Sequence, residues 1–291
     1  MKAVPVSLLL LFCFTSHAQD QNITWKTLGL KGRVKTMKEY KSDSTGSDRR
    51  LQTREEFTAN GLLKQSYVHY TNGFFNDYTY DSVLHITRMK RTRMNGTVDA
   101  EYSWFYDEKG KLLKNIEDNK EDTAYNTIFL YTYDNKGRKI RSESRTLDNR
   151  YKNHIEYVYK QDTAYCTHYE YGRPSDYKIR IYDSLGRQTE LIIRYSFSSP
   201  AVFMRYVTSF NEEGKEIKKI AYEDKGEFHH QFIYEYDSMG NQVRSTFSNL
   251  AGTEITTYEY TYDPAGNIIR EVTRTDGKIK YVYEYEYEYF D

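Results

Sequence analysis

The sequence predicts an all-β protein, an antiparallel β-meander of about ten hairpin repeats of 26 residues each. Two observations predict this class: a short turn motif that recurs at near-constant spacing, and stretches in which tyrosine alternates with charged residues. A third observation supports them, because no window of the sequence carries a convincing helical period. We expect the repeats to form a single-layer sheet that is curled or partly closed, since long open sheets rarely stay flat.

The recurring motif is aromatic-Asp-x-x-Gly. It occurs cleanly at residues 106–110, 133–137, 182–186, 236–240 and 262–266, with weaker copies at 57–61, 80–84, 159–163 and 210–214. With a first turn at Gly32, the motif recurs with a mean spacing of 26 residues. Asp at the start and Gly at the end fit a type I turn followed by a left-handed residue. Further turn signals midway, such as Asn95-Gly96 and Asp276-Gly277, divide each repeat into two strands, which predicts about twenty strands.

Tyrosine makes one face of the predicted strands. In residues 281–289 every odd position is Tyr, whereas the even positions are Val282 and three Glu. We interpret this face mainly as structural, because a Tyr ring packs while its hydroxyl reaches water. The alternative is a Tyr stripe that stacks on sugar rings or another flat ligand. The candidate ligand-binding residues are those of the last three repeats: Tyr234, Tyr236, Tyr258, Tyr260, Tyr262, Tyr281, Tyr283, Tyr285 and Tyr287.

The chain as a whole has no net charge, but its first and last predicted strands differ in charge. The 42 Lys and Arg equal the 42 Asp and Glu, which removes the basic surface that a nucleic-acid partner requires. The predicted first strand is basic, with Arg33 and Lys35, and the last is acidic, with Glu284 and Glu286. Unlike edges attract, so head-to-tail self-association and closure of one chain on itself are both open. A third interpretation is that the charges only keep both edges soluble.

The first eighteen residues have the layout of a secretory signal peptide. A positive start is followed by an apolar run over 4–14 and by a small-x-small cleavage site at 16–18. We therefore expect two segments, a signal peptide at 1–18 and a β-repeat domain at 19–291, exported to the periplasm, the cell surface or the medium. We expect no membrane-spanning segment in the mature chain. In the strand predicted at 139–147, neither face is apolar enough to meet lipid.

No arrangement of residues predicts catalysis. The phosphate-binding, zinc-protease, Cys-x-x-Cys and nucleophile-elbow motifs are absent from the sequence, and the six histidines after residue 18 are scattered over different repeats. We therefore expect no catalytic residue, no metal and no cofactor. Carboxylates are plentiful, but they alternate with Lys and Arg, so a glycosidase pair cannot be chosen among them.

The iterated aromatic-Asp-x-x-Gly-[Arg/Asn/Lys] motif resembles the YD repeat of the RHS family, over essentially the whole mature chain. That resemblance implies β-sheet shells in secreted or surface-attached bacterial proteins, some credited with carbohydrate binding. The best-known members wrap a C-terminal toxin, whereas this chain resembles a short, secreted member without one. We expect a non-enzymatic binding or scaffolding module of the cell envelope, with a glycan or another envelope protein as partner. The alternatives are a shell-type accessory that assembles with other proteins, and a carbohydrate-active enzyme.

Overall fold

The computed structural model describes residues 23–45, 48–69, 73–195 and 203–291, so the predicted signal peptide lies outside the described residues. The chain divides into two compact units. The first unit comprises the described part of Met1–Met37, with Thr53–Leu130 and Tyr287–Asp291, and the second comprises Lys38–Gln52 and Tyr131–Glu286.

Twenty strands and two short 3-10 helices follow one another along the described residues. The first ten strands are β1 (Val34–Ser42), β2 (Arg50–Phe57), β3 (Leu63–Val68), β4 (Phe74–Tyr80), β5 (Ile86–Arg93), β6 (Val98–Tyr106), β7 (Leu112–Asn119), β8 (Thr127–Tyr133), β9 (Lys139–Thr146) and β10 (Lys152–Lys160), with η2 (Thr123–Tyr125) before β8. The remaining strands are β11 (Thr163–Glu170), β12 (Arg173–Tyr182), β13 (Gln188–Tyr195), β14 (Phe203–Phe210), β15 (Glu216–Tyr222), β16 (Phe228–Tyr236), β17 (Gln242–Asn249), β18 (Gly252–Tyr262), β19 (Ile268–Thr275) and β20 (Lys278–Tyr289), with η3 (Asp224–Gly226) before β16.

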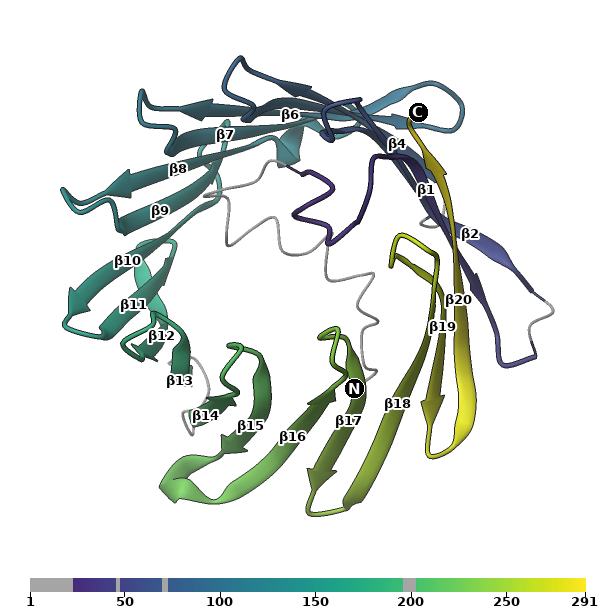
Figure 1. The fold of residues 1–291 in the computed structure, drawn as a ribbon. Helices are drawn as coiled ribbons and strands as arrows, with labels where there is room; N and C mark the ends of the chain where they lie inside the picture. The colour runs from purple at the N-terminus through teal and green to yellow at the C-terminus, as the bar shows by residue number, and fades with distance from the viewer. Residues whose placement is uncertain (1–22, 46–47, 70–72, 196–202) are drawn as a thin grey trace. The chain divides into compact units, whose positions relative to one another are not determined.

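Consecutive strands pair as antiparallel hairpins. In the second unit β16 pairs with β17, β17 with β18 and β18 with β19, and Figure 1 shows these four strands side by side in chain order. In the first unit β4 pairs with β5, β5 with β6 and β6 with β7 in the same way. The predicted all-β antiparallel class is therefore confirmed.

The prediction of a curled or partly closed sheet is wrong, because β1 pairs with β20 as well as with β2. Contacts between these two strands occur within each unit. In the first unit the Phe290 N–H donates to the Arg33 carbonyl at 2.8 Å, and in the second the Tyr40 hydroxyl donates to Glu286 at 3.1 Å. The strands therefore belong to one sheet in which the first and last strands pair, so neither β1 nor β20 is a free edge. The basic and acidic edges, which could have joined two copies head to tail, meet within one chain.

The predicted turn geometry is present at the motif. In the loop between β6 and β7, the Asp107 carboxylate accepts hydrogen bonds from the backbone N–H of Lys109 at 2.9 Å and of Lys111 at 2.8 Å. Gly110 N–H donates to the Asp107 carbonyl, and Gly110 has a φ of 78°. A bulge lies at the motif aromatic, where the register of the hairpin shifts between Phe105 and Tyr106. Asp therefore closes the loop, while Gly supplies the left-handed conformation that other residues adopt at a cost.

The motif tyrosine has a role that the sequence does not reveal. Its hydroxyl donates to a backbone carbonyl just after the preceding motif turn, a contact that we call the inter-repeat latch. The latch joins Tyr80 to Leu63, Tyr106 to Ile86, Tyr159 to Lys139 and Tyr236 to Glu216, at 2.6–2.9 Å. The residue after the motif Gly often lies over the aromatic ring of the next motif, as the Arg187 guanidinium does at 4.9 Å from the ring centre of Phe210. Each motif thus holds its own turn and also contacts a neighbouring repeat.

Replacing Tyr236 by Phe removes one inter-repeat latch and leaves the ring in place. We expect the free energy of unfolding to fall by about 1 kcal/mol, because the Glu216 carbonyl loses a partner in a half-buried position. Urea denaturation of the two proteins measures the difference. Tyr171→Phe is the matched control, since that side chain is exposed on a turn, and a loss as large as that of Tyr236→Phe would contradict the latch.

An apolar core lies in the first unit. Val34, Phe57 and Leu63 are almost completely buried and are covered by Trp25 and its neighbours from the segment that precedes β1. The Trp25 indole N–H donates to the Val34 carbonyl at 2.5 Å, and its ring centre lies 6.5 Å from that of Phe57 and 6.3 Å from that of Phe290. The residues before β1 therefore close the core beside the end of β20.

Candidate functional site

Eight of the nine tyrosines predicted to bind a ligand lie in the second unit, on β16, β18 and β20. The ninth, Tyr287, lies in the first unit and packs against its apolar core. Several of them serve the fold. Tyr236 forms an inter-repeat latch, the Tyr260 hydroxyl donates to the Gln242 carbonyl at 2.8 Å, and Tyr283 is only 4% exposed. The structure therefore brings most of the stripe together, but at these three positions the rings or hydroxyls are engaged by the protein itself.

Three ionisable side chains lie among these tyrosines. Glu271 of β19 faces Tyr260 of β18 on one side and Tyr283 of β20 on the other. The Lys41 ammonium of β1 lies 3.6 Å from the ring centre of Tyr281. Glu39 of β1 is 7% exposed, and burial, with a smaller effect of the Glu271 carboxylate, raises its pKa to about 7. Burial also raises the pKa of Glu271 and lowers that of Lys41.

A shallow groove of about 490 Å³ lies elsewhere in the second unit, on β11, β12 and β13. Its floor is formed by side chains from one face of the sheet. In the strand register Tyr165 stands opposite Ile179 and Ile179 opposite Ile192, while Tyr177 stands opposite Arg194. Tyr165 is 40% exposed and Tyr177 is 41% exposed. Within the described part of the chain, neither hydroxyl has a hydrogen-bond partner, so both aromatic side chains are available to a ligand.

Two cations flank the groove. The Lys160 ammonium lies 5.7 Å from the ring centre of Tyr165, and the Arg194 guanidinium lies 5.5 Å from that of Phe203. Neither cation forms an ion pair with any residue that the structure describes. The groove therefore combines two exposed aromatic rings with positive charge at its edges.

Sequence reasoning missed this groove because it followed the motif tyrosines, which lie on the other face of the sheet. Val158 precedes the motif aromatic Tyr159 and so points to the opposite face, and Val158 stands opposite Tyr165 in the register. Tyr177 lies five residues before the motif Tyr182, again in the opposite phase of the alternation. The signal was therefore present in the sequence as tyrosines out of phase with the turn motif.

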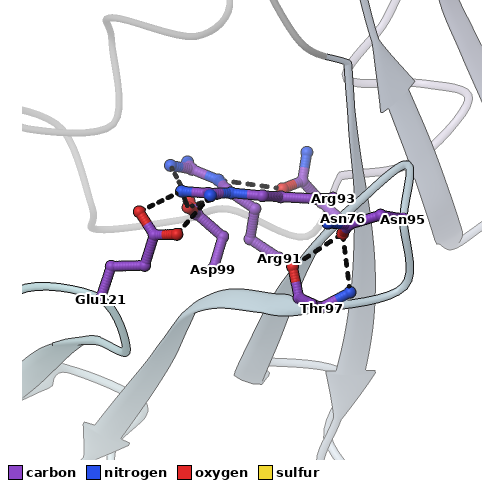
Figure 2. Close-up of polar contacts among 7 residues, drawn as sticks. All are labelled: Asn76, Arg91, Arg93, Asn95, Thr97, Asp99 and Glu121. Carbon is purple, nitrogen blue, oxygen red and sulfur yellow. Dashed lines mark hydrogen bonds and ion pairs between the residues drawn. The ribbon is translucent and has the colours of Figure 1, made fainter.

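A polar cluster in the first unit shows how charged residues are held between its strands. The Arg93 guanidinium donates to Asp99 at 2.7 Å and to both carboxylate oxygens of Glu121, as Figure 2 shows. Arg91 donates to the Asn76 side-chain oxygen at 3.4 Å. These hydrogen bonds and ion pairs raise the pKa of Arg93. Because the arginines are paired with residues of β4–β7 and the nearby loops, we interpret the cluster as structural.

No group of three or more His, Cys, Asp or Glu side chains is arranged to hold a metal ion in the part of the chain that the structure describes. Within that same part, no helix has both the length and the apolar character needed to cross a membrane.

No protein-family model matches the chain, and no curated protein matches it. Among solved structures it is similar to a Tc holotoxin pore of Photorhabdus luminescens, with 11% identity and a TM-score of 0.37 over 76% of this chain and 15% of that chain. It is also similar to a porin-like protein of Bacteroides vulgatus, with 12% identity and a TM-score of 0.36 over 88% of this chain and 99% of that chain. A porin-like protein of Bacteroides uniformis has 11% identity and a TM-score of 0.31, over 89% and 98%. With TM-scores below 0.5, these likenesses identify neither a family nor a function, and the YD-repeat resemblance rests on the turn motif.

Proposed function

We propose that the chain is an exported, non-enzymatic binding module that holds a carbohydrate in the groove formed by Tyr165 and Tyr177. The observation that carries this proposal is the pair of exposed rings on adjacent strands, whose hydroxyls have no partner among the described residues. A sugar ring has an apolar face that packs on an aromatic side chain and hydroxyls that pair with polar groups at the edge of the site. Contiguous apolar area exposed on a protein surface marks an interaction site.

The buried carboxylates Glu39 and Glu271 do not have the contrasting environments of an acid–base pair, since both are shifted by burial. Acid–base catalysis by two carboxylates needs environments that drive their pKa values apart, so that one is protonated while the other is ionised. The pKa values of Glu39 and Glu271 are both raised by burial. The export part of the proposal rests on the signal-peptide layout of residues 1–18.

A glycan array with the full chain tests the groove. We expect binding to at least one oligosaccharide, and a loss of tenfold or more in affinity when Tyr165 and Tyr177 are both changed to Ala, because aromatic anchors each contribute about 1–2 kcal/mol or more. Tyr125→Ala is the matched control, since Tyr125 is exposed in the first unit and should leave binding unchanged. Binding that survives the double substitution, with the circular dichroism spectrum unchanged, would exclude the groove. No binding to any glycan would reject the carbohydrate.

A further inference from the structure

One end of the groove on β11, β12 and β13 places a cation beside an aromatic ring. Arg194 of β13 stands directly opposite Tyr177 of β12 in the strand register, so the two side chains lie on the same face of the sheet. Side chains at directly opposite positions have Cβ atoms about 5 Å apart. Both residues line the groove and both are exposed. A ligand that packs on the Tyr177 ring therefore lies next to the Arg194 guanidinium.

Arg194 has no carboxylate partner among the residues that the structure describes. Its guanidinium lies 5.5 Å from the ring centre of Phe203, which stands opposite it on β14. Residues 196–202, which follow β13 in the sequence, include neither Asp nor Glu. The positive charge of Arg194 is therefore available to an anion that comes from outside the chain.

The carboxylates on the same face beside the groove are already paired with other arginines. Glu190 of β13 accepts hydrogen bonds from the Arg205 guanidinium at 2.7 Å and 3.0 Å. Glu156 of β10 accepts one from the Arg141 guanidinium at 3.1 Å. Because these carboxylates are held by their own partners, neither neutralises Arg194.

The other two cations near the groove have carboxylates of their own. Lys178 also lines the groove, but its ammonium lies 3.4 Å from the carboxylate of Asp176. Lys160 lies two residues from Asp162, in the turn that follows β10. Among the described residues that line the groove, none is Asp or Glu. The excess positive charge of the groove therefore lies at Arg194.

We propose that the groove selects an acidic sugar, a uronic acid whose ring packs on Tyr177 and whose carboxylate is bound by Arg194. This inference rests on the proposed carbohydrate-binding function and names the class of sugar. A guanidinium presents parallel N–H donors that match the two oxygens of a carboxylate. In a uronic acid the carboxylate is attached to the sugar ring itself, so a ring on Tyr177 brings its anion to Arg194. Tyr165 stands opposite Ile179, two residues from Tyr177 on β12, and packs on the adjoining sugar.

Titration calorimetry of the full chain with matched sugars tests this inference. The probes are oligosaccharides of galacturonic, glucuronic and mannuronic acid, each compared with its own methyl ester, which keeps the rings and removes the charge. We expect at least one acid to bind about tenfold or more tightly than its ester, because a charge-assisted pair of hydrogen bonds is lost in the ester. The difference should shrink as salt is added, since salt screens the ion pair.

Substitution of Arg194 gives a second measurement. Arg194→Gln should weaken binding of the acid about tenfold or more and leave binding of the methyl ester unchanged. Arg194→Lys keeps the charge but not the parallel donors, so its affinity for the acid should lie between the two. Arg270→Gln is the matched control, because it removes the same charge from an exposed position on β19 of the same unit, and it should leave both affinities unchanged.

Failure of this inference and failure of the proposed function give different results. Glycan binding in which every acid equals its ester, or in which Arg194→Gln binds the acid as tightly as the unchanged chain, overturns the acidic sugar and leaves the carbohydrate groove in place. A sulfated galactan oligosaccharide that binds more tightly than every uronic acid overturns the assignment to a carboxylate. No binding of any glycan rejects the carbohydrate function and this inference with it.

Discussion

Replacing Trp25 by Ala is expected to lower the free energy of unfolding by about 3 kcal/mol. The indole covers Val34 and Phe57 and also contacts Phe290 beside the end of β20. Gly61 makes this approach possible, since a Cβ there would lie 2.8 Å from the indole ring. Truncation would therefore leave a cavity and remove the side chain that joins the residues before β1 to the end of β20.

Urea denaturation followed by circular dichroism measures this loss. Trp25→Phe is the informative comparison, because it keeps an aromatic ring and removes the N–H that donates to the Val34 carbonyl. We expect it to cost about 1 kcal/mol, the usual net value of one hydrogen bond, plus a small packing term. A Trp25→Ala variant within 1 kcal/mol of the unchanged chain would show that Trp25 does not hold the core.

The second large effect is a loss of stability as pH rises through neutrality. Glu39 has an ordinary pKa of 4.5 when exposed, and burial in the folded chain raises this pKa to about 7. The folded state therefore binds the proton more tightly than the unfolded state. The contribution of Glu39 to the free energy of unfolding is fully present below pH 4.5 and is lost as pH rises through 7. The loss amounts to about 3 kcal/mol. The raised pKa of Glu271 acts in the same direction.

The variant Glu39→Gln separates the contribution of Glu39 from that of the other ionisable groups. The amide stays neutral at every pH, so we expect the variant to equal the unchanged chain near pH 4.5 and to exceed it by about 3 kcal/mol at pH 8. Urea denaturation at several pH values between these limits gives the comparison. Glu288→Gln is the matched control, because Glu288 is exposed on β20 and should leave the pH dependence unaltered. Equal pH dependence in the unchanged chain and Glu39→Gln would remove Glu39 as its source.

The candidate site shows what the alternation of side chains along a strand can and cannot predict. Alternation places tyrosines on one face of a strand, but it does not say which rings the neighbouring strands then cover. Tyr283 is buried beneath its neighbours, whereas Tyr165 and Tyr177 stay exposed on the other face. Burial depends on residues from three or more strands, and their register is set by bulges that a single strand does not reveal.

Local patterns of residues are sufficient to predict the class, the turns and the approximate number of strands. A turn such as that of Asp107 and Gly110 depends on residues within five positions of one another, so its chemistry can be identified directly. Three features depend on tertiary contacts: the pairing of the first and last strands, the inter-repeat latches of the motif tyrosines, and the position of the exposed groove on the opposite face of the sheet. The pairing of β1 with β20 joins residues 246 positions apart, as at Tyr40 and Glu286. Local pattern cannot specify such a contact, because its free energy comes from side chains that meet only after the intervening strands have paired.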